Sequence, residues 1–255
     1  MGAGIGPSDD DAMRLKLLFT QFVQALGRRL RLRQQAVATA MVYFRRFYQS
    51  PRSMGDFDPL LIAPTALWMA SKVEESTVTV KAVVREAKEV ARVLSVAFHY
   101  ASEHLVDAEY TMLATLSSTL TVHHPHASLS HLLAGADLRA QLGAEKVDCF
   151  VQTAWFLLND TYRTDLPLLQ PPDAIALACA RVAGLLEHVD TERLLRTHAD
   201  GVHDRIACIS DTLLALYEHC DALSPGTLSA VHERLSVLWA SQRARAAEQA
   251  QATEE

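Results

Sequence analysis

The densest group of possible metal ligands in the chain is a short histidine-rich loop formed by His123, His124 and His126. A zinc site needs several nitrogen, sulfur or carboxylate ligands, and no cysteine or acidic residue lies at ligand spacing from these histidines. A His-Pro turn between two helices is typical of a surface loop whose imidazoles are partly protonated. We therefore expect neither a metal ion nor any other cofactor.

Sequence motifs of the common enzyme classes are missing. The chain contains neither a Gly-x-Gly-x-x-Gly turn nor a Gly-x-x-x-x-Gly-Lys loop for nucleotide phosphates, and it has no His-Glu-x-x-His motif. No Gly-x-Ser-x-Gly elbow is present to place a nucleophilic serine. A Ser/His/Asp triad stays open, because its members come together only in the fold. With no positive feature of catalysis, we predict a protein that is not an enzyme.

The charge of the chain indicates what kind of partner it has. Lysine and arginine together number 24 against 30 aspartate and glutamate residues, which gives a formal net charge of -6. No overall field would attract the chain to nucleic acid or to an anionic membrane. We therefore expect a protein partner.

Cysteine usage and the absence of targeting segments indicate a soluble intracellular protein. The cysteines form no Cys-x-x-Cys pair and lie in apolar helical stretches, so we expect small core residues in a reducing compartment: Cys149, Cys179, Cys208 and Cys220. Residues 1–11 lack the basic start and apolar run of a signal peptide, and no run of about 18 apolar residues follows.

Apolar residues recur at steps of three and four, which predicts helices along nearly the whole chain. The expected helices of the first half are residues 11–27, 32–48, 59–75, 79–95 and 102–116. Those of the second half are residues 129–134, 145–163, a segment opened by Pro171 and Pro172, 191–197 and 203–220. Gly27 is placed to end the first helix, and the helix opened by Pro59 is apolar on most sides, so it must be buried all round.

An internal duplication relates the two halves. A shift of 113 positions places Pro59 on Pro172, Ile62 on Ile175 and Ala70 on Ala183. The sequence thus predicts an all-α fold of two consecutive five-helix bundles followed by a C-terminal helix. We expect a disordered leader over residues 1–10, one bundle over 11–121, a second over 122–222, and a C-terminal helix with a polar tail over 223–255.

Two long stretches closely resemble the first cyclin box in the form found in cyclin C: LRQQAVATAMVYFRRFY at residues 32–48 and DPLLIAPTALWMASKVEE at 58–75. VHHPHASL at residues 122–129 resembles the loop between the two boxes of that family. NDTYRTD at 159–165 and LLQPPDAIALACARVA at 168–183 resemble the second box. The resemblance covers residues 15–217.

The resemblance implies a regulatory subunit that activates a cyclin-dependent kinase of the Mediator kinase module, in the nucleus. A cyclin docks on the C helix of its kinase and thereby stabilises the active conformation. By motif, Lys72 and Glu109 match the residues that hydrogen-bond the kinase backbone beside that helix. A second surface, a groove between the boxes that binds another Mediator kinase-module subunit, maps onto Glu74, Trp155, Asn159, Asp160 and Tyr217.

The sequence is compatible with several alternative roles for these residues and for the chain. Trp155 and Tyr217 could instead be packing residues between the boxes, and Asn159 and Asp160 could cap a helix end. We assign Phe44, Tyr48 and Leu67 to the core first, although an interface role is also possible. Only about ten residues precede the first helix, where the family has a longer segment that helps select the kinase. The chain could therefore serve another transcriptional kinase, or be a kinase-independent binding module of the same fold.

Overall fold

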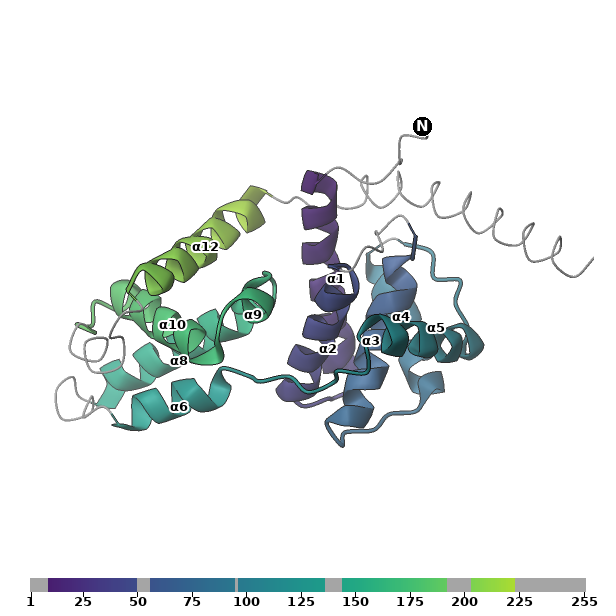
Figure 1. Ribbon diagram of the computed structural model, residues 1–255, viewed down its shortest axis with the longest axis horizontal. Helices are drawn as coiled ribbons and strands as arrows, with labels where there is room; N and C mark the ends of the chain where they lie inside the picture. Colours follow the sequence, from purple (N-terminus) through teal and green to yellow (C-terminus); the bar gives the residue numbers. More distant parts are fainter. Residues whose placement is uncertain (1–8, 50–55, 95, 136–143, 192–202, 223–255) are drawn as a thin grey trace, which may run out of the picture. The chain divides into compact units, whose positions relative to one another are not determined.

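The computed structural model describes residues 9–49, 56–94, 96–135, 144–191 and 203–222 (Figure 1). Every regular element within these ranges is a helix, which confirms the predicted all-α fold. The described residues divide into two compact units, one ending at Leu120 and the other running from Thr121 to Ala222. Each unit has its own central helix.

Among the described residues, the first unit contains five helices: α1 (Asp9–Arg29), α2 (Gln34–Phe47), α3 (Pro59–Val73), α4 (Val80–Val93) and α5 (Ser102–Thr115). Helix α3 lies at the centre and packs against the other four, as the apolar pattern predicts. Its small residues Ala63, Ala66 and Ala70 are fully buried. Alanine at these positions lets the neighbouring helices approach the α3 backbone closely.

The start of α3 is fixed by two residues. Pro59 occupies the first helical position, where its missing N–H leaves no donor unsatisfied. The Asp58 carboxylate caps the helix by accepting a hydrogen bond of 2.9 Å from the Leu60 backbone N–H. Its other oxygen accepts a bond of 2.6 Å from the Tyr100 hydroxyl, which ties the segment before α5 to the start of α3.

The prediction that Gly27 ends the first helix is wrong, because α1 continues through it to Arg29. A Cβ atom at Gly27 would lie far inside van der Waals contact with Cγ2 of Val37 on α2, so this glycine allows the two helices to pack closely. The helix ends instead with Arg31 in the left-handed region, at a φ of 54°. The Leu32 N–H then bonds back to the Gly27 carbonyl, which closes the helix in a Schellman arrangement.

The second unit contains α6 (His126–Gly135), α8 (Ala144–Thr161), the short α9 (Leu166–Leu169), α10 (Pro172–Leu186) and α12 (His203–Ala222). Helix α10 is central and packs against α6, α8 and α12. Its bounds are those of α3 shifted by the 113 positions of the repeat. Both helices also end alike, because Glu75 and His188, one shift apart, have φ values of 52° and 53°.

Other expectations differ from the structure in detail. Helix α6 begins at His126 rather than near Leu129, and the short α9 was not predicted. Cys179 is buried as expected, but Cys149 and Cys208 are exposed, so the core prediction is wrong for these two. The side chain of Cys220 lies outside the part of the chain that the structure describes. Helix α1 begins at Asp9, inside the expected leader.

Three predicted segments lie outside the described residues, wholly or in part. They are residues 1–8 of the leader, most of the expected helix at 191–197, and the C-terminal helix and tail over 223–255.

Candidate functional site

The two residues matched to the kinase contact come together in the first unit. Lys72 lies in the last turn of α3, Glu109 lies on α5, and the Lys72 ammonium forms an ion pair with Oε1 of Glu109. The Lys72 side chain is 37% exposed and that of Glu109 is 18% exposed. The pair thus bridges two helices at the surface, where both side chains keep hydrogen-bonding capacity for a partner.

An aromatic ring holds the lysine from a second side. The Lys72 Nζ atom lies 3.8 Å from the centroid of the Trp68 ring, one turn earlier on α3. This is the geometry of a cation–π contact, and it restricts the otherwise mobile lysine side chain. Trp68 is not among the residues predicted from the sequence, although its spacing of four residues from Lys72 is a usable signal.

Exposed apolar side chains follow both charged residues in the sequence. Val73, next to Lys72, is 40% exposed, and Tyr110, next to Glu109, is 70% exposed. Together, Trp68, Lys72, Val73, Glu109 and Tyr110 form what we call the α3–α5 patch. Aromatic and charged groups combined in this way are typical of a protein-binding surface.

The three residues whose role the sequence left open belong to the core. Phe44 and Leu67 are fully buried, and Tyr48 is nearly so. The Tyr48 hydroxyl donates a hydrogen bond of 2.9 Å to the Phe57 carbonyl, and burial raises its pKa well above the usual value. The preference for core positions is therefore confirmed.

In the second unit, the histidine loop is part of a hydrogen-bonded aromatic cluster. The His124 Nδ1 atom lies 2.6 Å from the Tyr162 hydroxyl, and the His126 Nε2 atom lies 3.1 Å from Oδ1 of Asn159. The His126 ring also packs on Trp155, with the centroids 5.3 Å apart.

The prediction of a surface loop with partly protonated imidazoles is wrong for two of the three histidines. Burial lowers the pKa of His124 to about 4. Burial also lowers the pKa of His126, and its hydrogen bond with Asn159 opposes this only in part. Both rings are therefore neutral at pH 7, whereas His123 is exposed. The error arises because His126 begins α6 and its ring lies against α8.

Four of the five residues assigned to the groove take part in contacts within the second unit. Trp155 and Asn159 hold His126, as described. Asp160 accepts a hydrogen bond of 2.8 Å from the Tyr217 hydroxyl on α12. These contacts fix the positions of the four side chains, and the groove assignment itself stays a prediction.

The fifth groove residue, Glu74, belongs to the first unit and is the C-cap residue of α3. Its carboxylate accepts a hydrogen bond of 2.7 Å from the Thr39 hydroxyl on α2. The second unit has the same arrangement, because Glu187, the C-cap residue of α10, accepts a bond of 2.6 Å from Thr153 on α8. The Glu74 contact is thus a feature of the repeat.

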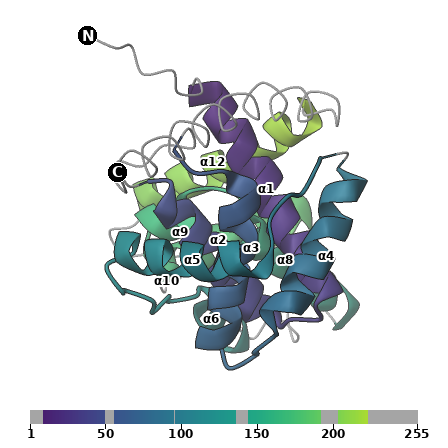
Figure 2. The same cartoon turned by 90° about the vertical axis from the view of Figure 1, so that its right-hand side faces the viewer.

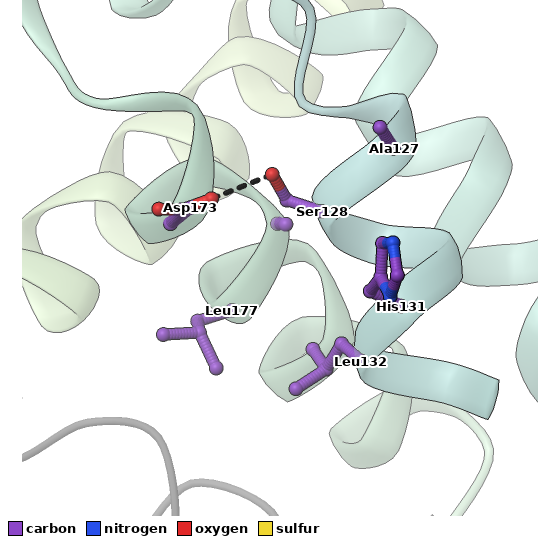
Figure 3. A pocket seen from close by; sticks show the side chains of 7 residues that line it. Ala127, Ser128, His131, Leu132, Asp173 and Leu177 are labelled. Atoms are coloured by element: carbon purple, nitrogen blue, oxygen red, sulfur yellow. Dashed lines mark hydrogen bonds between the residues drawn. The ribbon is translucent and has the colours of Figure 1, made fainter. Parts of the chain in front are cut away.

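A pocket of about 550 Å³ between α6 and α10 contains the residue types of a catalytic triad (Figure 3). The Ser128 hydroxyl donates a hydrogen bond of 2.6 Å directly to Oδ1 of Asp173. His131 lines the same pocket from α6, but it does not stand between them. A triad requires the imidazole to bond both the serine and the carboxylate, so this group does not have that geometry.

Two further kinds of site are absent from the described part of the chain. No three histidine, cysteine or acidic side chains there are placed to hold a metal ion. No helix there is long and apolar enough to cross a bilayer.

Comparison with known proteins gives consistent similarities in sequence. Residues 7–121 match the family model described as the N-terminal domain of cyclins. Cyclin-C of Rattus norvegicus is 37% identical over 219 residues, which cover 83% of this chain and 74% of the relative. Cyclin-C of Drosophila melanogaster is 33% identical over 217 residues, which cover 83% of this chain and 78% of the relative.

Solved structures share the fold. A chain in the structure of the CAK complex of Chaetomium thermophilum bound to ATP-gamma-S matches with a TM-score of 0.69 and 21% identity, covering 94% of this chain and 79% of that chain. A chain in the structure of the yeast TFIIK (Kin28/Ccl1/Tfb3) complex matches with a TM-score of 0.59 and 20% identity, covering 81% of this chain and 88% of that chain.

Proposed function

The chain belongs to the cyclin family, and we propose that it is a non-catalytic regulatory subunit that activates a cyclin-dependent kinase of the Mediator kinase module. In this role it regulates transcription by RNA polymerase II in the nucleus. The similarity to cyclin C over most of the chain supports the choice of kinase class. The family resemblance alone supports the nuclear location.

The Lys72–Glu109 pair is the observation that carries the proposal. A cyclin shifts the conformational equilibrium of its kinase only if it binds the active conformation more tightly than the inactive one. Polar groups held in fixed positions beside the kinase C helix can favour the active conformation in this way. Here an ion pair between α3 and α5 and a cation–π contact hold both groups before any partner binds. Such preorganisation lowers the entropic cost of association.

The two units have different roles in this proposal. The first unit, which carries the α3–α5 patch, is the kinase-binding cyclin box. The second unit is the second box, and its residues Trp155, Asn159, Asp160 and Tyr217 contact another Mediator kinase-module subunit, as does Glu74 of the first unit. Within the second unit, hydrogen bonds hold Asn159, Asp160 and Tyr217 in fixed positions, which suits a role in binding a partner.

Co-purification of the full chain with its cell's kinases, followed by a kinase assay on the eluate, tests the proposal. We compare the wild type with a Lys72→Ala/Glu109→Ala variant. A Lys146→Ala/Asp211→Ala variant is the matched control, because it removes one exposed cation and one exposed carboxylate that belong to no proposed contact. Hydrogen bonds to charged groups contribute about 1.5–3 kcal/mol each, so losing them should weaken kinase association at least about tenfold.

The outcomes distinguish the alternatives. Retention of an active Mediator-type kinase by the wild type and the control, with loss in the Lys72→Ala/Glu109→Ala variant, supports the activator role and both contact residues. If the wild type retains a different transcriptional kinase, that kinase is the partner instead of the Mediator-type kinase. If the wild type retains no kinase although circular dichroism shows an intact fold, the chain is a kinase-independent binding module.

A further inference from the structure

Helix α4 carries a stripe of positive charge on its outer face. Its four cations, Lys81, Arg85, Lys88 and Arg92, follow one another at steps of four, three and four residues, so they lie along one side of the helix. All four are exposed. The residues of the opposite side are buried in the first unit: Val83, Val84, Ala87, Val90 and Ala91.

The stripe is only partly neutralised by acidic neighbours. The Glu86 carboxylate pairs with Arg85 at 3.0 Å and with Arg29 of α1 at 2.8 Å, and Glu89 pairs with Arg92 at 2.8 Å. Lys81 and Lys88 have no carboxylate partner among the residues that the structure describes.

This local excess of positive charge contrasts with the whole chain, whose net charge is -6. The net charge of the whole chain therefore does not reveal this basic surface. Helix α4 packs beside α1 at an edge of the first unit (Figure 2). Since all four cations are exposed, the stripe is accessible to a partner.

We propose that the α4 stripe is a docking site for an extended segment of a partner protein that is rich in aspartate and glutamate. The eleven steps from Lys81 to Arg92 span about 16 Å, because a helix rises about 1.5 Å per residue. An extended segment covers that length with about five residues. Its alternate side chains lie about 6–7 Å apart on one side, close to the spacing of neighbouring cations along the helix.

An acidic protein segment fits the stripe better than a nucleic acid does. Duplex DNA carries a negative charge for about every 1.7 Å of its axis, so its phosphates would also approach Glu86 and Glu89. The net negative charge of the chain opposes such a polyanion at long range. A peptide can instead place single carboxylates beside the unpaired Lys81 and Lys88 and leave neutral residues beside the glutamates.

This docking site goes beyond the proposed kinase contact, because it uses α4 rather than α3 and α5. Exposed ion pairs are individually weak and are screened by salt, so we expect weak binding that falls as the salt concentration rises. Such a site would steer and orient a partner whose main contacts lie elsewhere.

Fluorescence anisotropy of a labelled ten-residue peptide, in which glutamate alternates with serine, tests the proposal on the full chain. We compare the wild type with Lys81→Glu/Lys88→Glu. The matched control is Lys146→Glu/Arg205→Glu, which makes the same change of charge at two exposed cations of the second unit. A milder Lys81→Gln/Lys88→Gln variant serves if circular dichroism shows that the charge reversal disturbs the fold.

We expect the wild type to bind the peptide at low salt, and the Lys81→Glu/Lys88→Glu variant to bind at least about tenfold more weakly. The control should lose less than about threefold. The proposal is wrong if the wild type does not bind, or if both charge-reversed variants weaken binding equally. Tighter binding of a single-stranded oligonucleotide of equal charge through the same two lysines would also overturn it, in favour of nucleic acid.

Discussion

Replacing Gly27 by alanine tests the close packing of α1 on α2. Two opposing effects are expected. Alanine is favoured over glycine inside a helix by about 1 kcal/mol, and Gly27 lies inside α1. The added Cβ, however, would overlap Cγ2 of Val37, and inserting a methyl group into a packed core costs about 1–3 kcal/mol.

The sign of the effect should therefore depend on residue 37. In the wild-type background, we expect Gly27→Ala to lower the free energy of unfolding by up to about 2 kcal/mol. In a Val37→Ala background the overlapping methyl is absent, so the same substitution should raise it by up to about 1 kcal/mol. The coupling between the two sites then equals the cost of the overlap, about 1–3 kcal/mol, which exceeds the error of additivity.

Urea unfolding followed by circular dichroism of the four proteins of this cycle measures the coupling. Gly184→Ala is a useful contrast, because its Cβ would lie 2.9 Å from the Val189 backbone oxygen as well as against Thr191. Replacing Thr191 by alanine should therefore restore only part of the stability that Gly184→Ala removes. If Gly27→Ala is equally destabilising with valine or alanine at position 37, the packing argument fails.

Three further outcomes follow from particular contacts. Trp68→Leu should weaken kinase association about two- to fivefold when Lys72 is present and have no effect in a Lys72→Ala background, because the ring acts by holding the lysine; titration of the purified kinase measures this. Lowering the pH from 7 to 5 should reduce the free energy of unfolding of the wild type by up to about 2 kcal/mol more than that of the His124→Gln variant. Urea unfolding of both proteins at each pH measures this difference. At pH 5, His124 binds a proton in the unfolded chain, where its pKa is about 6.5, but not in the folded chain, where its pKa is about 4. A thiol reagent should modify Cys149 in the folded chain while Cys179 stays protected until unfolding, as peptide mapping by mass spectrometry would detect.

The sequence alone predicts those helices whose pattern of apolar residues fits only one position in the fold. A helix that is apolar on most sides and opened by proline can only be a central helix, and both α3 and α10 lie where the repeat places them. Lys72 and Glu109 were named from their motif, and only the structure reveals that they bond each other.

The errors occur where one residue type serves two purposes. Glycine both ends helices and permits close contact between them, and Gly27 does the second. His126 was placed in a loop because the sequence carries no sign that α8 covers it. The basic stripe of α4 was hidden for a different reason, since a net charge averages over all faces of the molecule.

The internal repeat also provides a comparison between equivalent positions within one chain. The hydrogen bond from a threonine to the glutamate that ends the central helix occurs in both units, at Thr39–Glu74 and Thr153–Glu187, which marks it as part of the common scaffold. The glutamates are 113 positions apart, and the threonines 114. The position of Lys72 corresponds instead to Leu185, an exposed apolar residue. After the duplication, the two copies therefore kept the same helix-ending contact while this neighbouring surface position diverged. A second unit built on the same frame is thus expected to recognise a chemically different partner from the first.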